Sequence, residues 1–270
     1  MAFSGAYPWR SAAITGASSG LGRALAEALA APGVTLHLSG RDAARLAEAA
    51  NACRARGATA HESILDVRDA AATEAHLRAA GRLDLVIANA GISAGTGGLT
   101  EPADQARTIM ETNVQGVLNT AIPALAIMAA QAPGADGVRG RVAVVASIAG
   151  FIAAPGAPAY CASKFAVRAW AEAADPGARA QGLRVHAVCP GYIRTPMTAS
   201  NAFPMPFLMS AEDAAHRTLR GIARDRVRIA YPWPLYAAAR VLGALPPRWI
   251  GALMGRFPAK GRVATEDGPT

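Results

Sequence analysis

The chain has 270 residues, of which 52% are hydrophobic and 17% charged, so it can bury a sizeable core and is not a disordered protein. Its three cysteines, Cys53, Cys161 and Cys189, lack the spacing of metal ligands, and their odd number argues against a disulfide framework. We therefore expect no metal site and a reducing, cytoplasmic setting. The first ten residues carry no signal-peptide pattern, and no apolar run is long enough to cross a bilayer.

The net charge of +8 is concentrated near the C-terminus. From Arg217 onward, ten Lys or Arg stand against three Asp or Glu, a surplus of seven that leaves about +1 for the rest. A basic segment can favour anionic lipid or an acidic partner, but scattered arginines are more often a solvated face. We expect no nucleic-acid binding, because no reader motif accompanies the charge.

The first predicted unit is a strand, a glycine-rich turn and a helix. The apolar strand 11–15 enters the sequence TGASSGLG, and a helical pattern follows until Pro32-Gly33. Glycines allow close approach of the backbone to a pyrophosphate, and the helix N-terminus attracts an anion. The turn therefore predicts a dinucleotide site formed by Gly16, Ser18, Ser19, Gly20, Leu21 and Gly22.

The second predicted strand, 34–39, ends in Ser39-Gly40-Arg41. An acidic residue at this place binds the ribose 2′-hydroxyl of NAD in the common dinucleotide-binding pattern. Here no carboxylate is present, and Arg41 can pair with a 2′-phosphate. The cofactor prediction is therefore NADP, with NAD the weaker alternative; otherwise Arg41 only occupies the turn before a helix capped by Asp42.

Further strands and helices alternate along the chain. After a helix over 42–56, a third strand ends at Asp66-Val67, where Asp66 can accept from an adenine amino group or cap the helix that begins near Asp69. A strand over 83–88 ends in Asn89-Ala90-Gly91. A long helix over 104–130 carries Asn113, an unusual residue within a helix.

The second half of the chain repeats this alternation. Strand 141–146 leads to Ser147, and a helix with Tyr160 and Lys164 follows. Strand 183–188 is followed by Pro190, Gly191, Ile193 and Thr195, then a helix over 211–223 and a strand over 226–231. We expect a single doubly wound Rossmann domain over residues 1–231, with about seven parallel strands and right-handed crossovers. Residues 232–270 form a short helical, basic, amphipathic extension that is not an independent domain.

Ser147, Tyr160 and Lys164 offer a hydroxyl, a phenol and an ammonium. Tyr160 and Lys164 are four residues apart and share one helix face. A neighbouring ammonium stabilises a phenolate and lowers the pKa of the phenol from its ordinary value near 10. Such a pair can move a proton on or off a carbinol oxygen, while the serine hydroxyl hydrogen-bonds to the same oxygen.

These residues resemble the short-chain dehydrogenase/reductase family over about residues 12–229. The supporting motifs are TGASSGLG at 15–22, Asp66-Val67, Asn89-Ala90-Gly91, Asn113, Ser147, YCASK at 160–164, and Pro190-Gly191 with Thr195. The resemblance implies a catalytic tetrad of Asn113, Ser147, Tyr160 and Lys164. By this resemblance, Tyr160 is the general acid/base and Lys164 contacts the nicotinamide ribose. Asn113 holds a water of the proton relay, and segment 190–195 contacts the nicotinamide carboxamide.

The sequence departs from the family pattern in the helix after Lys164. It contains Asp175-Pro176-Gly177, which we expect to kink or end that helix. The resemblance places a dimer interface on this helix, so a homo-oligomer remains an open possibility.

Two segments bear on the substrate and on partners. The loop 192–210 is apolar and rich in methionine, which indicates an apolar substrate, or a lid folded onto its own core. The extension reads as two short helices joined at Pro246-Pro247, with residues from about 261 expected to be disordered. It can dock on protein, the favoured reading, or lie at the inner face of a membrane.

The leading hypothesis is an NADP(H)-dependent oxidoreductase that interconverts a carbonyl and an alcohol on an apolar substrate. Two rivals remain: a dinucleotide-binding sensor or scaffold on the same fold, and a membrane-surface protein that acts through its basic tail. The complete tetrad favours the enzyme.

Overall fold

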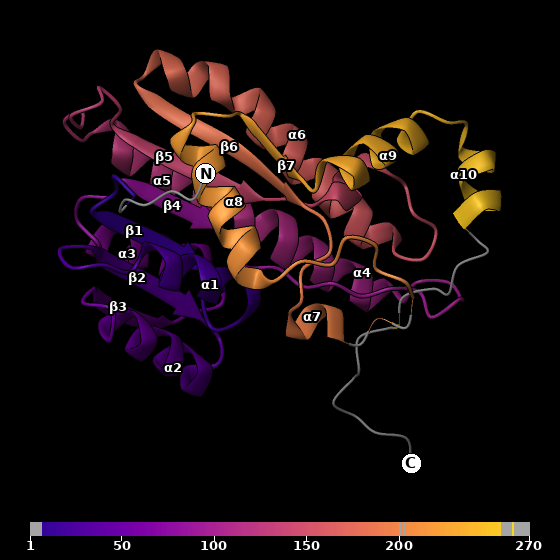
Figure 1. The fold of residues 1–270 in the computed structure, drawn as a ribbon, viewed down its shortest axis with the longest axis horizontal. Coiled ribbons are helices and arrows are strands. Elements are labelled where there is room, and N and C mark those ends of the chain that lie inside the picture. Colours follow the sequence, from indigo (N-terminus) through magenta and orange to yellow (C-terminus); the bar gives the residue numbers. More distant parts are fainter. Residues whose placement is uncertain (1–6, 200, 202, 255–260, 262–270) are drawn as a thin grey trace.

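Seven strands form one parallel sheet in the computed structural model, which describes residues 7–199, 201, 203–254 and 261 (Figure 1). The spatial order is β3-β2-β1-β4-β5-β6-β7, so the order reverses between β1 and β4, where such sheets open a ligand crevice. The strands are β1 (Ser11–Thr15), β2 (Thr35–Gly40), β3 (Thr59–Ile64), β4 (Leu85–Ala88), β5 (Gly140–Val145), β6 (Leu183–Pro190) and β7 (Arg228–Tyr231). The predicted fold class is confirmed.

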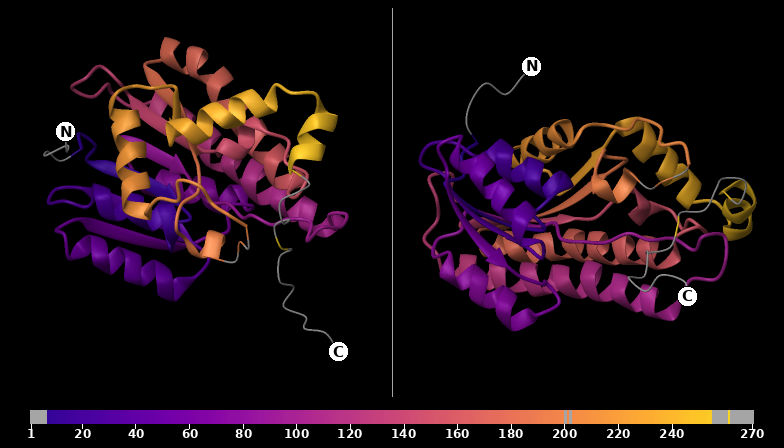
Figure 2. Two further views of the ribbon diagram at one scale, coloured as in Figure 1. Left: turned by 45° about the vertical axis from the view of Figure 1, so that its right-hand side comes forward. Right: turned by 90° about the horizontal axis from the view of Figure 1, so that it is seen from below.

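Helices cover both faces of the sheet (Figure 2). One face packs against α1 (Gly20–Leu29), α2 (Ala43–Arg54) and α8 (Ala211–Ala223). The other packs against α3 (Ala70–Ala79), α5 (Gly116–Ala129) and α6 (Pro158–Ala180). Alternate residues of the central strands supply the two cores, as Ile87 does on one face and Val86 on the other. Because both faces are covered there, β4 and β5 are nearly continuous apolar runs in the sequence.

The predicted long helix over 104–130 is interrupted by a π-helical turn. It consists of α4 (Ala103–Met110), a π segment (Glu111–Gln115) that contains Asn113, and α5. Single π turns within α-helices are frequent at functional sites. In the sequence, the sign of this interruption was Asn113, a residue type that is unusual within a helix.

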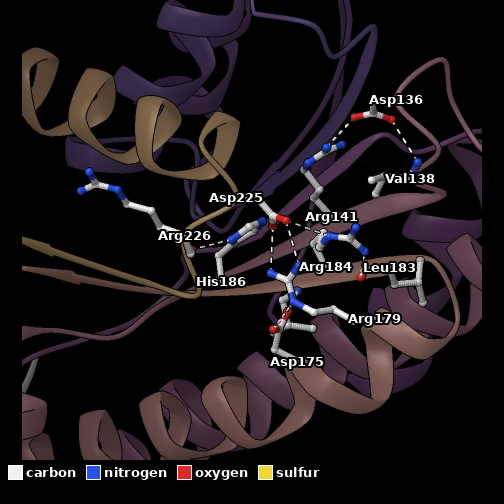
Figure 3. A network of polar contacts seen from close by, with 11 residues as sticks. Asp136, Val138, Arg141, Asp175, Arg179, Leu183, Arg184, His186, Asp225 and Arg226 are labelled. Atoms are coloured by element: carbon white, nitrogen blue, oxygen red, sulfur yellow. Dashed lines mark hydrogen bonds and ion pairs between the residues drawn. The ribbon is translucent and has the colours of Figure 1, made fainter.

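Helix α6 does not end at Asp175-Pro176-Gly177, so one of the two outcomes predicted for this segment, an end of the helix, is wrong, and the other, a kink, stays a prediction. It continues through Pro176 to Ala180. The buried carboxylate of Asp175 accepts hydrogen bonds from Val185 N and from Arg179, and Figure 3 shows Arg179 and Arg184 both facing Asp225. These contacts with β6 and with the segment before β7 hold the last turn in helical form against the local cost of proline.

The C-terminal extension forms the predicted two helices, α9 (Trp233–Gly243) and α10 (Pro247–Met254). Helix α9 packs on the domain, with Ala239 buried and Tyr236 in edge-to-face contact with Phe151. The expected disorder concerns 261–270, of which all but Gly261 lie outside the described residues. Among the described helices, none is long and apolar enough to span a bilayer.

Candidate functional site

A cleft of about 320 Å³ lies at the carboxyl ends of the central strands. All but two of the predicted site residues line it: Gly16, Ser18, Ser19, Gly20, Leu21, Arg41, Asp66, Val67, Asn89, Ala90, Gly91, Ser147, Tyr160, Lys164, Pro190, Gly191, Ile193 and Thr195. The two exceptions are Gly22 and Asn113. The topology therefore brings segments from seven parts of the chain to one place.

The glycines of the first turn are required by backbone conformation and by close packing. Gly16 and Gly20 have φ of +67° and +54°, a region that other residues rarely adopt. A Cβ on Gly16 would lie 2.8 Å from Ala90 Cα, and one on Gly22 would collide with the carbonyl oxygen of Gly16. Gly22 therefore acts through helix–strand packing, which explains its place behind the cleft wall.

The N-terminus of α1 opens into the cleft with its amide groups available. Its N-cap, Ser19, makes no capping hydrogen bond, and the first turn contains no acidic residue. The first N–H groups of a helix lack partners within the helix and attract anions. This arrangement fits the pyrophosphate of a dinucleotide.

Asn89 and Thr15 join the ends of β4 and β1 behind this turn. The Asn89 side chain donates to the carbonyls of Thr15 and Gly16, at 3.0 and 3.1 Å. The Thr15 hydroxyl accepts from the amides of Asn89 and Ala90. Asn89 thus fixes the shape of the glycine turn as well as lining the cleft.

The end of β2 carries arginines and no free carboxylate toward the cleft. Asp42 caps α2 as predicted and also pairs with Arg45 at 2.7 Å. Arg41 is exposed on the cleft and makes no hydrogen bond or ion pair with the described residues. A 2′-phosphate would meet an arginine that forms no ion pair with the described acids, although Asp66 is near enough to interact with it electrostatically.

Asp66 is paired at the end of β3 rather than used as a helix cap. Arg68 donates to both of its oxygens, and this pairing holds the pKa of the Asp66 carboxyl below its usual range. Asp69 caps α3 by accepting from Ala72 N. The capping alternative for Asp66 is therefore wrong, and its carboxylate remains on the cleft.

Ser147, Tyr160 and Lys164 meet where β5, β6 and α6 come together. The Ser147 hydroxyl accepts from Ala149 N at 3.0 Å and is hydrogen-bonded to Tyr160. Lys164 is buried, and its Nζ donates to the carbonyl of Val145 at 3.0 Å. The same Nζ lies 5.8 Å from the centre of the Tyr160 ring. A hydroxyl, a phenol and an ammonium thus share one wall of the cleft.

The electrostatics of this group differ from the expectation based on sequence. Burial raises the pKa of Tyr160 to about 12, although its hydrogen bond with Ser147 opposes the shift. Burial also lowers the pKa of Lys164 to about 8. In the protein alone, desolvation is the largest influence on the Tyr160 phenol and its pKa is raised, so the predicted lowering of this pKa is wrong.

Asn113 lies behind the cleft and organises its wall. Its side chain accepts from Ile92 N at 2.8 Å and donates to Ile92 O and to the Ser163 hydroxyl. The side chain is fully buried and holds the segment that follows Gly91 against α6. The amide is therefore engaged with protein groups, and the water-holding role implied by the resemblance remains a prediction.

Sequence analysis missed Glu101, which lies far from α6 in the sequence and caps the N-terminus of that helix, the one that carries Tyr160. The N-cap of α6, Ala157, has no side chain that can cap. Glu101 Oε2 accepts from Ala159 N at 2.9 Å and so supplies that cap, and its other oxygen accepts from Gln105. The only signal in the sequence was an alanine at a position that favours Ser, Thr, Asp or Asn.

The apolar loop 192–210 divides between cleft and core. Ile193 is buried and Met209 packs against the main core, whereas Met197 and Phe207 are largely exposed. Tyr192 and Phe203 form an edge-to-face pair, and burial raises the pKa of Tyr192. Met209 fits the reading of a loop folded onto its own core, and the apolar-substrate reading stays a prediction.

Comparisons with known proteins identify the family of this chain. Residues 10–203 of the chain match the model of a family described as "short chain dehydrogenase". An "Uncharacterized oxidoreductase" of Myxococcus xanthus is 38% identical over 242 residues, which cover 88% of this chain and 93% of that protein. "Oxidoreductase UcpA" of Escherichia coli K12 is 32% identical and covers 72% of this chain and 73% of its own length.

Two solved structures with bound cofactor share the fold. A short chain dehydrogenase/reductase from Burkholderia phymatum in complex with NAD has a TM-score of 0.78 and 26% identity, covering 97% of this chain and 98% of that one. A short-chain dehydrogenase from Sphingobium yanoikuyae in complex with NADPH has a TM-score of 0.73 and 25% identity, covering 95% and 98%. The chain therefore belongs to the short-chain dehydrogenase/reductase family, and it is an oxidoreductase on the fold that binds NAD(P).

Proposed function

We propose that the protein is an NADP(H)-dependent oxidoreductase that interconverts a ketone or aldehyde and the corresponding alcohol. The observation that carries this proposal is the placement of Tyr160, Ser147 and Lys164 on one wall of a cleft whose other end is the glycine turn and the N-terminus of α1. One end can hold a dinucleotide phosphate, and the other can exchange a proton with a substrate oxygen.

Each residue of the proposed catalytic group has a distinct task. Nicotinamide, when bound, supplies or accepts the hydride. Tyr160 gives a proton to the substrate oxygen or takes it back, and Ser147 orients that oxygen by a hydrogen bond. Lys164 stays cationic at neutral pH, since its pKa is about 8, and can bind ribose hydroxyls while it donates to Val145.

The preference for NADP rests on Arg41. It is exposed on the cleft and unpaired among the described residues, and the acids nearest in sequence or space, Asp42 and Asp66, are each paired with another arginine. The related structures include both an NAD complex and an NADPH complex, so the choice depends on this chain's own residues.

An apolar substrate is proposed because apolar side chains stand beside the catalytic group. Ile193 and Met197 line the cleft, and Phe203 lies against Tyr192 of the same loop. Among the described residues of this loop, Arg194 carries the only charge, and it is exposed. A charged substrate would find no buried partner there.

The test is Tyr160→Phe, assayed for NADPH oxidation with a panel of apolar aldehydes and ketones. We expect turnover to fall by at least ~100-fold, the usual weight of a general acid, while NADPH binding measured by fluorescence stays within a few-fold. Tyr7→Phe, which alters a hydroxyl bonded to His216 far along the chain, is the matched control. Retention of most activity by Tyr160→Phe would refute the assignment. Tight NADPH binding by the wild type without turnover of any substrate would instead favour the sensor.

A further inference from the structure

The helices α9 and α10 expose an unusual set of large apolar side chains. Trp233 is 73% exposed, Val241 67%, Trp249 65% and Leu253 44%. Trp233 and Val241 are eight residues apart in α9, and Trp249 and Leu253 are four apart in α10, so each pair shares one side of its helix. We call these four residues the tail face.

The opposite side of α9 is fixed to the domain, so the tail face is held outward. A Cβ on Gly243 would collide with the carbonyl oxygen of Phe151, and one on Gly191 would lie 2.8 Å from Leu235. The Tyr236 hydroxyl accepts from Arg228, which is itself paired with Glu172. The tail therefore docks on protein through one side, as the sequence favoured, and still presents an apolar side to solvent.

Charge indicates what covers the tail face. The sequence between Asp225 and Glu266 contains seven Lys or Arg and no Asp or Glu. Among the described members, Arg240 and Arg248 are exposed on the same two helices as the tryptophans. Two copies of this surface packed together would bring like charges into contact, which disfavours a second copy of the chain as the occupant.

We propose that the tail face binds the surface of a bilayer that contains anionic lipid. Tryptophan is favoured at the boundary between head groups and acyl chains, and each nearby arginine adds attraction to an anionic leaflet. Figures 1 and 2 place α10 at one end of the molecule, beside the loop before α4, and Gly261 O accepts from Gly95 N there. That loop carries Leu99, whose side chain is 69% exposed.

The experiment is sedimentation of the full chain with vesicles of phosphatidylcholine alone or mixed with phosphatidylglycerol. We expect binding to the mixed vesicles at low salt, at least ~10-fold weaker binding to neutral ones, and loss of most binding at high salt. Trp233→Ser with Trp249→Ser, and separately Arg240→Gln with Arg248→Gln, should each weaken binding ~10-fold or more. Ile122→Ser, which removes an exposed apolar side chain of α5, is the matched control and should not change it.

Two outcomes would overturn the proposal. One is the absence of preferential binding to anionic vesicles, or binding that both double variants retain. The other is self-association of the wild type, seen by light scattering, that the tryptophan variant abolishes, because a second copy would then be the occupant. NADPH turnover in solution reports separately on the proposed enzyme, and either proposal can fail while the other stands.

Discussion

Replacing Arg41 with alanine should weaken NADPH binding and leave NADH binding nearly unchanged. Hydrogen bonds to charged groups contribute about 1.5–3 kcal/mol. Arg41 is exposed and interacts electrostatically with Asp66, and both facts favour the lower end of this range, although no described acid forms an ion pair with its guanidinium. A loss of about 1.5 kcal/mol corresponds to a roughly tenfold higher Kd for NADPH. Arg41→Asp adds repulsion of the 2′-phosphate and should raise the Kd further.

The assay is a fluorescence titration of wild type, Arg41→Ala and Arg45→Ala with each cofactor. Arg45 lines the same cleft but is already paired with Asp42, so its replacement should change the NADPH Kd by less than that of Arg41. If Arg41→Ala weakened the binding of NADPH and NADH equally, Arg41 would maintain the shape of the turn without contacting the 2′-phosphate. Tighter binding of NADH than NADPH by the wild type would refute the cofactor assignment itself.

Three further predictions concern stability and positioning. Asp175→Ala should lower the free energy of unfolding in urea by about 2–3 kcal/mol, because it leaves the buried Val185 N–H unpaired. Asp136→Ala, which removes an exposed ion pair, should lower it by about 0–1 kcal/mol. Equal losses in the two variants would contradict this reasoning. Burial lowers the pKa of His37 to about 4, so on acidification the unfolded chain binds a proton at this residue near pH 6.5, before the folded chain does. The free energy of unfolding should therefore fall by up to about 3 kcal/mol as the pH drops from 6.5 to 4. In His37→Gln, melting curves recorded across this pH range should show a smaller loss of stability. Glu101→Leu removes the cap of α6 and should lower the free energy of unfolding by about 1–2 kcal/mol and kcat severalfold, with the Kd for NADPH unchanged. If only the Kd for NADPH changed, Glu101 would not act by positioning α6.

Most of the fold could be predicted because local signals and tertiary structure agree along this chain. The apolar runs became the buried strands, and helix α8 has the predicted bounds Ala211–Ala223. Helix α6 is the exception, since proline and glycine propensities disfavour its last turn. The contacts that overrule them include the ion pair of Arg179 with Asp225, 46 residues further along the chain. A pairing at that separation leaves no trace in a window of local sequence.

The site was predictable where its residues form motifs and hidden where they do not. All motif residues but Gly22 and Asn113 line one cleft. Glu101, which belongs to no motif, acts on α6 through Ala159, 58 residues away. The pKa of Tyr160 was misjudged for a related reason. Spacing places Lys164 next to the phenol, whereas the extent of burial around that phenol is a property of the folded chain.

The raised pKa of Tyr160 has a consequence for the direction of the proposed reaction. With a pKa of about 12, the phenol is protonated at pH 7 and is ready to donate to a forming alkoxide, as carbonyl reduction requires. Alcohol oxidation requires the phenolate, which is a minor form at that pH unless another positive charge is bound nearby. We therefore expect kcat for reduction to be level near pH 7 and to fall above about pH 8 as Lys164 loses its proton, and kcat for oxidation to rise with pH. Profiles measured in both directions on one ketone–alcohol pair test this, and a reduction rate that climbs steadily from pH 7 to 9 would contradict it.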